Sequence, residues 1–260
     1  MTVNNREDIP TARRIVVKVG SSSISGENAH QIPVIVDALA ELHARGVEVV
    51  LVSSGAIASG LPFLKLDARP TDLPTQQAAA AVGMNVLMNR YQDSLDRFKI
   101  VAGQVLLTAG DMEHETSRDN ARAALDRLLS LRILPIVNEN DAVGTSEIRF
   151  GDNDRLAALV AVLIEADALV LLSDVDAIYT RPPHEEGAQR IEYVTYGDSL
   201  GGVEFGEIGA AGVGTGGAGT KVAAAQHATE NGTAVLITSA ALVASALRGE
   251  AVGTWFEAAS

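Results

Sequence analysis

The sequence contains no cysteine. Disulfide frameworks, thiolate metal sites and cysteine nucleophiles are therefore excluded. Aromatic residues are also scarce, at 4% of the 260 residues, whereas hydrophobic residues make up 47%. A chain of this length can bury a large core, and alanine, valine, leucine and isoleucine must build most of it.

Positively charged residues are fewer than negatively charged ones. The chain carries 20 Lys and Arg against 33 Asp and Glu, which gives a formal net charge of −13 at pH 7. This balance argues against nucleic-acid binding, because phosphate neutralisation needs a basic face. Most of the excess acid is expected on a solvated surface. Any anion that this protein binds must therefore be held by a few locally placed cations.

Long hydrophobic runs are missing as well. The N-terminal stretch MTVNNREDIPTA is polar and lacks the apolar region of a signal peptide. The most apolar stretch, LAALVAVLIEADALVLL, is interrupted by Glu165 and Asp167, and a membrane span needs about 18 uninterrupted apolar residues. The sequence thus predicts a soluble, cytoplasmic protein.

Strand and helix patterns alternate along the chain. Short runs rich in β-branched residues predict strands over residues 13–19, 47–52, 99–107, 133–138, 168–173 and 233–238. Helical spacing predicts helices over residues 28–46, 75–98, 117–132, 152–166 and 221–232. This order is typical of an α/β fold with a mostly parallel open sheet between two layers of helices. We expect one domain over residues 1–260, with an exposed hairpin at 181–190.

In such sheets, ligands bind beyond the carboxyl ends of the strands. The residues at those positions are mostly small and polar. They are Gly20-Ser21-Ser22, Ser53-Ser54-Gly55, Asn138-Glu139-Asn140-Asp141, Ser173-Asp174 and Thr238-Ser239.

The segment GVGTGGAGTK (residues 212–221) resembles two phosphate-binding motifs and satisfies neither. A P-loop needs lysine before the serine or threonine, whereas Thr220 precedes Lys221 here. Both the P-loop and the dinucleotide-binding motif directly follow a strand, and GEIGAAGV is not a strand pattern. A glycine run still allows backbone N–H groups to converge on an anion, and Lys221 opens a predicted helix whose N-terminus favours negative charge. Anion binding is favoured over a plain surface loop.

A second lysine, Lys18, lies inside an apolar strand. A charged group there is costly unless its head reaches the sheet edge or meets an anion. Together with Lys221, it suggests two cations that converge on one phosphoryl group, since phosphoryl transfer depends largely on charge stabilisation.

Carboxylates and amides gather in NENDAV (138–143) and GDNDRLA (151–157). Asp152 at a helix start is most simply a capping residue. The group formed by Asp141, Asp152, Asn153 and Asp154 exceeds what capping needs. It could hold an ammonium group, a metal ion or the two lysines. The five histidines show no metal-ligand spacing, and no residue is assigned as a metal ligand.

Six segments, taken in order, resemble the amino-acid kinase family: VVKVGSSSI, SSGAIASG, VNENDAV, FGDNDRLAALVA, LLSDVDAIYT and GVGTGGAGTK. The resemblance covers about residues 13–257. NENDAV followed by GDND narrows it to the members that phosphorylate the γ-carboxylate of L-glutamate with ATP, the first step of proline biosynthesis. The resemblance implies the amino-acid kinase fold, with an N-lobe at about 13–166 for glutamate and a C-lobe at about 167–258 for the nucleotide.

The resemblance also implies roles for single residues. Lys18 and Lys221 stabilise the transferring phosphoryl group, and Asp154 orients both lysines. The residues implied to bind glutamate are Ser54, Asp141, Asp152 and Asn153. Those implied to bind ATP, which carries Mg²⁺, are Lys18, Ser173, Asp174, Thr215, Gly216, Gly217, Ala218, Gly219, Thr220 and Lys221.

The chain departs from the family pattern in small ways. SSGA replaces the commoner TSGA, and Ala218 stands where methionine is common. Many members carry a C-terminal PUA domain, and we expect none here. The resemblance further implies a homo-oligomer, a dimer or tetramer, and hand-over of the product to glutamate-5-semialdehyde dehydrogenase.

Other functions stay open from the residues alone. An aspartate, N-acetylglutamate or uridylate kinase shares the fold and the two lysines that stabilise the phosphoryl group. A uridylate kinase also needs a basic region at the acceptor site, whereas NENDAV and GDND are acidic. A non-catalytic nucleotide sensor is disfavoured, because nucleotide binding alone does not require both Lys18 and Lys221. An NAD-dependent oxidoreductase is disfavoured because the glycine run does not follow a strand.

Overall fold

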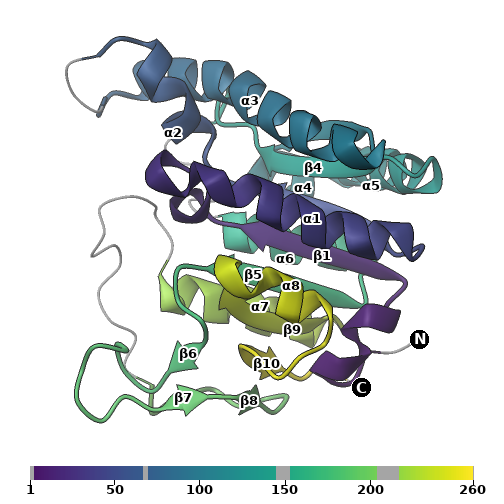
Figure 1. Cartoon of the computed structure of the whole chain (residues 1–260), viewed down its shortest axis with the longest axis vertical. Coiled ribbons are helices and arrows are strands. Elements are labelled where there is room, and N and C mark those ends of the chain that lie inside the picture. The colour runs from purple at the N-terminus through teal and green to yellow at the C-terminus, as the bar shows by residue number, and fades with distance from the viewer. Residues whose placement is uncertain (1–2, 67–69, 145–152, 204–216, 260) are drawn as a thin grey trace.

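The computed structural model describes residues 3–66, 70–144, 153–203 and 217–259. Its central feature is an eight-stranded sheet in the order β3-β4-β2-β1-β5-β9-β10-β8 (Figure 1). The strands are β1 (Arg14–Val19), β2 (Glu48–Ser53), β3 (Ala102–Leu107), β4 (Leu134–Glu139), β5 (Ala168–Ser173), β8 (Tyr193–Val194), β9 (Ala234–Ser239) and β10 (Thr254–Phe256). All neighbouring pairs are parallel except β9 with β10, so the predicted mostly parallel sheet is confirmed.

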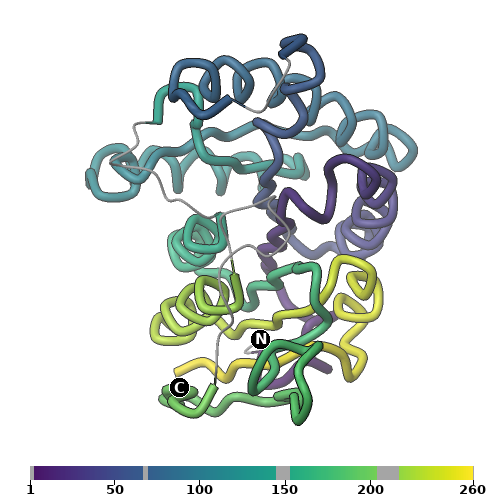
Figure 2. The backbone as a smooth tube through the Cα atoms, turned by 90° about the vertical axis from the view of Figure 1, so that its left-hand side faces the viewer, coloured from purple at the N-terminus to yellow at the C-terminus, as the bar shows by residue number. Residues whose placement is uncertain are grey.

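Helices cover both faces of the sheet (Figures 1 and 2). One buried cluster joins the sheet to α1 (Gln31–Ala44), α3 (Leu73–Leu95) and α8 (Val243–Leu247). The other joins it to α4 (Ala109–Glu113), α5 (Glu115–Ser130), α6 (Asn153–Leu163) and α7 (Ala218–Glu230). The short elements are α2 (Ala56–Gly60) and the 3₁₀-helices η1 (Arg6–Thr11), η2 (Ser21–Ser23), η3 (Gly26–His30), η4 (Leu61–Phe63), η5 (Asp96–Phe98) and η6 (Ala240–Leu242).

The two faces follow from the alternation of side chains along each strand. In β1, Ile15, Val17 and Val19 pack on the α1 side, whereas Val16 packs on the α6–α7 side. Lys18 has the same parity as Val16. The sequence of β1 therefore directs the lysine toward α6 and α7.

Two glycines let α2 cross α3 at very short range. A Cβ atom added to Gly60 would lie 1.9 Å from the Ala79 carbonyl oxygen, and one added to Gly83 would lie 1.7 Å from that of Ala56. Any larger residue at either position would push the helices apart. The contact fixes α2, which directly follows the end of β2, against the middle of α3.

Most element predictions agree with the structure to within a few residues. The hairpin expected at 181–190 is the connection between β6 (Ile178–Tyr179) and β7 (Arg190–Ile191), which pair antiparallel. One boundary was wrong: α7 begins at Ala218, so Lys221 lies in its first turn and does not open it. The Thr220 hydroxyl accepts from the Gly217 N–H and donates to the Gly217 carbonyl, and this local bonding extends the helix backwards.

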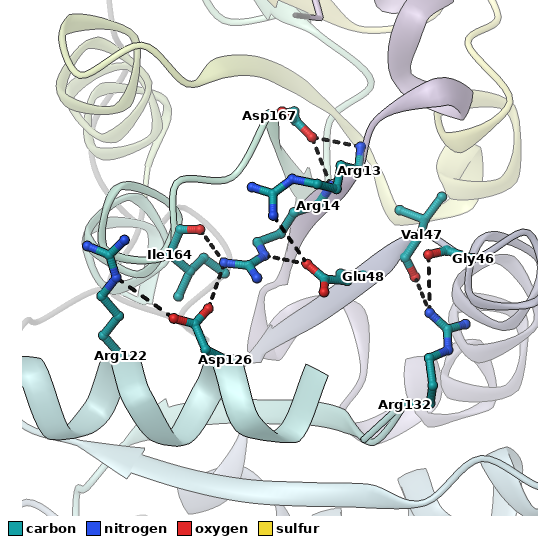
Figure 3. A network of polar contacts seen from close by, with 10 residues as sticks. All are labelled: Arg13, Arg14, Gly46, Val47, Glu48, Arg122, Asp126, Arg132, Ile164 and Asp167. Atoms are coloured by element: carbon teal, nitrogen blue, oxygen red, sulfur yellow. Dashed lines mark hydrogen bonds and ion pairs between the residues drawn. The ribbon is translucent and has the colours of Figure 1, made fainter. Parts of the chain in front are cut away.

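A buried arginine ties together the amino ends of the strands (Figure 3). Arg14 donates to Glu48 on β2, to Asp126 on α5 and to the Ile164 carbonyl after α6. The Asp167 carboxylate accepts from the backbone N–H groups of residues 13 and 14. This network lies at the opposite end of β1 from Lys18.

Within the residues that the structure describes, no helix is both long and apolar enough to cross a membrane.

Candidate active site

Three charged side chains meet at the carboxyl end of β1. Asp154 contacts the ammonium group of Lys18 through Oδ1, and its Oδ2 lies 3.1 Å from Nζ of Lys221. The exposed fractions of the side chains are 4% for Lys18, 8% for Lys221 and 0% for Asp154. Of the three roles left open for the acidic cluster, contact with the lysines is the one in which the structure places Asp154.

Local structure explains why these three residues converge. Lys18 points to the α6–α7 side of the sheet, Asp154 lies in the first turn of α6, and Lys221 lies in the first turn of α7. Helix N-termini favour anions, which suits Asp154 and any phosphate that approaches α7. Gly20 leaves room beside the cluster, since a Cβ atom there would lie 3.8 Å from the Lys18 ammonium nitrogen.

Two lysines share one carboxylate in this cluster. Burial of charged groups is costly, and it is tolerated when the groups pair with one another. Asp154 holds the two ammonium groups close together, which places several N–H donors in a poorly hydrated environment. Such a site is suited to an anion with several oxygens, such as a phosphoryl group.

A network of amides and hydroxyls lies beside the lysines. The side-chain N–H₂ of Asn153 lies 2.9 Å from Ser54 Oγ, 2.9 Å from Asn138 Oδ1 and 3.1 Å from the Ser53 carbonyl oxygen. Asn153 thus joins the start of α6 to the ends of β2 and β4. Ser54 of SSGA and Asn153 of GDND were predicted to bind the same substrate, and the structure places their side chains in contact.

The oxygen of the Asn153 amide faces no donor in the part of the chain that the structure describes. This Oδ1 atom is also buried. A buried acceptor without a donor is costly. A ligand that brings N–H donors, such as an ammonium group, would relieve that cost.

The other residues predicted to bind the acceptor substrate are Ser54, Asp141 and Asp152. Ser54 donates its backbone N–H to the Val19 carbonyl and is followed by Gly55 at φ +95°, a left-handed conformation that favours glycine. Asp141 lies in the turn directly after β4, half-buried. Asp152 lies outside the described residues.

The predicted nucleotide residues form a second group. Ser173 ends β5 and donates to the carboxylate of the exposed Asp174 at 3.0 Å. Residues 217–221 form the start of α7, with Gly217, Ala218, Gly219 and Thr220 ahead of Lys221. Thr215 and Gly216 lie outside the described residues.

The sequence prediction missed three residues of the network behind the site. Asn138 and Ser53 were noted only as strand-end residues, and Tyr91 was not noted at all. Asn138 also donates to Met84 Sδ at 3.3 Å, and Tyr91 bonds with Ser53. The polar strand ends were a usable signal for the first two, but nothing in an alanine-rich helix marks Tyr91.

The fold and the lysine cluster define a phosphotransferase-like α/β protein, and residues 13–239 match the family described as "Amino acid kinase family". The chain belongs to this family, as the motifs indicated. A relative named glutamate 5-kinase from Leifsonia xyli subsp. xyli is 70% identical over 98% of this chain and 95% of its own length. Relatives with the same name from Clavibacter michiganensis subsp. michiganensis and Streptomyces coelicolor are 70% and 52% identical, over 98% and 69% of their own lengths.

A solved structure supports the same fold. The carbamate kinase from Giardia lamblia bound to AMP-PNP matches 96% of this chain and 100% of its own with a TM-score of 0.70. The sequence identity is 16%, so this likeness concerns the fold alone.

Proposed function

We propose that this protein catalyses the glutamate 5-kinase reaction: transfer of the γ-phosphoryl group of ATP to the γ-carboxylate of L-glutamate, the first step of proline biosynthesis. Relatives of that name match nearly the whole chain at up to 70% identity. The structural observation that carries the proposal is the shared contact of Lys18 and Lys221 with Asp154, beside the Ser54–Asn153 pair.

The chemistry requires no general base. A glutamate side chain has a pKa near 4.3 in water and is ionised at pH 7. One of its oxygens attacks the γ-phosphorus, and the bond from that phosphorus to the β–γ bridging oxygen breaks. The electron pair leaves with ADP, and the product is L-glutamyl 5-phosphate. The main task is to bring two anions together, which positioning and positive charge accomplish.

Lys18 and Lys221 supply that charge in our proposal, and Asp154 orients them. An ammonium group carries three N–H donors, so each lysine can keep its contact with Asp154 while it donates to phosphate oxygens. The low exposure of the cluster strengthens these interactions, because water screens them little. Gly20 allows a substrate oxygen to approach Lys18.

The acceptor subsite consists of Ser54, Asn153, Asp141 and Asp152. The Oδ1 of Asn153, which has no donor among the described residues, is suited to the substrate ammonium group. The carboxylates of Asp141 and Asp152 would add opposite charge to it, which selects an amino acid over a simple diacid.

The nucleotide subsite consists of Lys18, Ser173, Asp174 and residues 215–221. The first turn of α7 presents backbone N–H groups and a buried lysine to phosphate. In this arrangement ATP lies across residues 167–258, the proposed C-lobe, and glutamate across residues 13–166, the proposed N-lobe.

Magnesium is proposed as part of the nucleotide. In the described parts of the chain, no three His, Asp or Glu side chains gather into a metal-binding cluster, and both oxygens of Asp154 contact lysine. Magnesium commonly binds through substrate phosphates and keeps several waters. The steps above are derived without it.

At the level of assembly, we propose a homo-oligomer, a dimer or tetramer. We also propose that a glutamate-5-semialdehyde dehydrogenase consumes the product, since an acyl phosphate in free solution is open to hydrolysis.

The test is ADP release from ATP and magnesium with L-glutamate, L-aspartate, N-acetyl-L-glutamate or UMP as acceptor. Hydroxylamine is included to trap an acyl phosphate as a hydroxamate. Turnover and hydroxamate with L-glutamate alone are expected. Turnover with a different acceptor would support the phosphoryl role of the two lysines and refute the assignment of the acceptor subsite to glutamate. ATP binding without turnover on any acceptor would indicate a nucleotide sensor.

A further inference from the structure

One face of α3 supports the acceptor subsite from behind. Gln77, Met84 and Tyr91 are seven residues apart, which places them in one stripe along the helix. Gln77 Nε2 donates to the Gly144 carbonyl at 3.0 Å, Met84 Sδ accepts from Asn138 at 3.3 Å, and the Tyr91 hydroxyl lies 2.9 Å from Ser53 Oγ. All three partners lie at or just after the carboxyl ends of β2 and β4.

The contact of Tyr91 has a defined direction. The Ser53 hydroxyl donates to the Ser54 carbonyl at 3.0 Å, and it has only one proton. Tyr91 must therefore be the donor to Ser53 Oγ. Burial raises the pKa of Tyr91 above its ordinary value, so its hydroxyl keeps the proton that it donates. The chain of hydrogen bonds runs from Tyr91 through Ser53 to the backbone of Ser54.

The backbone N–H, the carbonyl and the hydroxyl of Ser54 each make a hydrogen bond in this arrangement. Its N–H donates to the Val19 carbonyl at 3.0 Å, its carbonyl accepts from Ser53, and its Oγ accepts from Asn153. The Ser53 carbonyl accepts from the same Asn153 amide. A shift of residues 53–54 would therefore move both Ser54 Oγ and the Asn153 side chain.

We infer that Tyr91 is a positioning residue for the acceptor subsite: its hydrogen bond to Ser53 fixes the peptide at 53–54, and through it the relative placement of Ser54 and Asn153. This inference rests on the proposed function, since the acceptor is taken to bind at those two residues. Tyr91 lies fully buried on α3 and touches no reactant in this scheme. Its influence is transmitted through Ser53.

The experiment compares Tyr91→Phe, Ser53→Ala and the double variant. Phenylalanine keeps the ring and removes only the hydroxyl. Loss of one neutral hydrogen bond predicts a rise in the KM for L-glutamate of about fivefold, with the KM for ATP within about twofold of wild type. Because both single changes remove the same bond, the double variant should match the more impaired single variant and not the product of the two effects.

Thr233→Val is the matched control. The Thr233 hydroxyl is buried and donates to the Ala166 carbonyl at 3.1 Å, far along the chain from the acceptor residues. Its loss should lower thermal stability to a degree similar to Tyr91→Phe and leave both KM values unchanged.

The outcomes distinguish failure of the role inferred for Tyr91 from failure of the proposed function. Wild-type turnover of L-glutamate with an unchanged KM in Tyr91→Phe would overturn this inference and leave the proposed function intact. Equal rises in the glutamate and ATP KM values, or the same rise in Thr233→Val, would also overturn it, because a general loss of structure would explain them. Absence of glutamate turnover in the wild type would refute the proposed function and this inference with it.

Discussion

Lys221 and Asp154 form an ion pair that is almost completely removed from water, with 3.1 Å between Nζ and Oδ2. The two residues come from the first turns of neighbouring helices, α7 and α6. Lys18 on β1 contacts the other oxygen of the same carboxylate. The cluster thus joins a strand and both helix starts at the sheet edge where ligands of open α/β folds bind.

Loss of either lysine should abolish most turnover. Lys18→Met and Lys221→Met keep much of the side-chain volume and remove the charge that stabilises the transferring phosphoryl group. Removal of one such donor typically lowers kcat by about 100-fold or more. ADP release at saturating ATP and L-glutamate measures the effect. Lys99→Met, at an exposed position, should retain wild-type turnover; undiminished turnover in both site variants would refute the phosphoryl role.

Asp154→Asn should destabilise the protein and lower its activity. The change is nearly isosteric, but it removes the carboxylate that both buried lysines contact, and such broken pairs typically cost about 3–5 kcal/mol. Trp255, the only tryptophan, is buried and provides a fluorescence signal for unfolding. We expect ATP to stabilise the variant, because phosphate supplies the missing negative charge. A variant as stable as wild type without ATP would contradict the assigned ion pairs.

Much of this arrangement could be predicted from sequence, and the gaps have physical causes. Apolar β-branched runs predict the long strands β1, β2, β4, β5 and β9, since burial on both faces demands such residues. The helices α2 and α8, at five residues each, and the strands β8 and β10 are too short to show a period.

The same limit applies to the site. Lys18 and Lys221 were predicted to act together, because a lysine in an apolar strand and one after a glycine run are unusual. The family resemblance implied that Asp154 orients both lysines, and both contact it in the structure. The residues alone left that role open among three, because local patterns do not encode how β1, α6 and α7 pack. Tyr91 was missed for the same reason: its hydroxyl meets Ser53, 38 positions away in the chain.

Asn153→Ala should impair the use of L-glutamate and spare that of ATP. The change removes both the amide that contacts Ser54 and the Oδ1 atom, to which no residue in the described part of the chain donates. Hydrogen bonds to a charged ligand contribute about 1.5–3 kcal/mol, so we expect the glutamate KM to rise at least about tenfold. Initial rates with each substrate varied in turn give the two KM values. A larger rise in the KM for ATP would place Asn153 in the nucleotide subsite.

The raised pKa of Tyr91 predicts a difference in alkaline stability. Burial holds the hydroxyl neutral in the folded state, whereas in the unfolded chain it ionises near its ordinary pKa of about 10. Above that pH the unfolded state binds fewer protons than the folded state, so stability falls as pH rises, by up to about 1.4 kcal/mol per pH unit. Denaturant unfolding from pH 8 to 11 should show a shallower loss in Tyr91→Phe. Identical pH dependence would contradict burial of the hydroxyl.

Arg14→Met should lower stability and leave catalysis unchanged. Arg14 is buried and bonds Glu48, Asp126 and the Ile164 carbonyl at the end of β1 remote from the lysines (Figure 3). Glu48 and Asp126 are partly exposed and regain water when the arginine is lost, so the expected cost is about 2–3 kcal/mol, below that of a fully buried pair. Arg122→Met removes two more exposed pairs, one with the same Asp126 and one with Glu165, and should cost less than about 1 kcal/mol. Denaturant unfolding followed by Trp255 fluorescence measures both. A changed kcat in folded Arg14→Met would mean that this network also controls the geometry of the site.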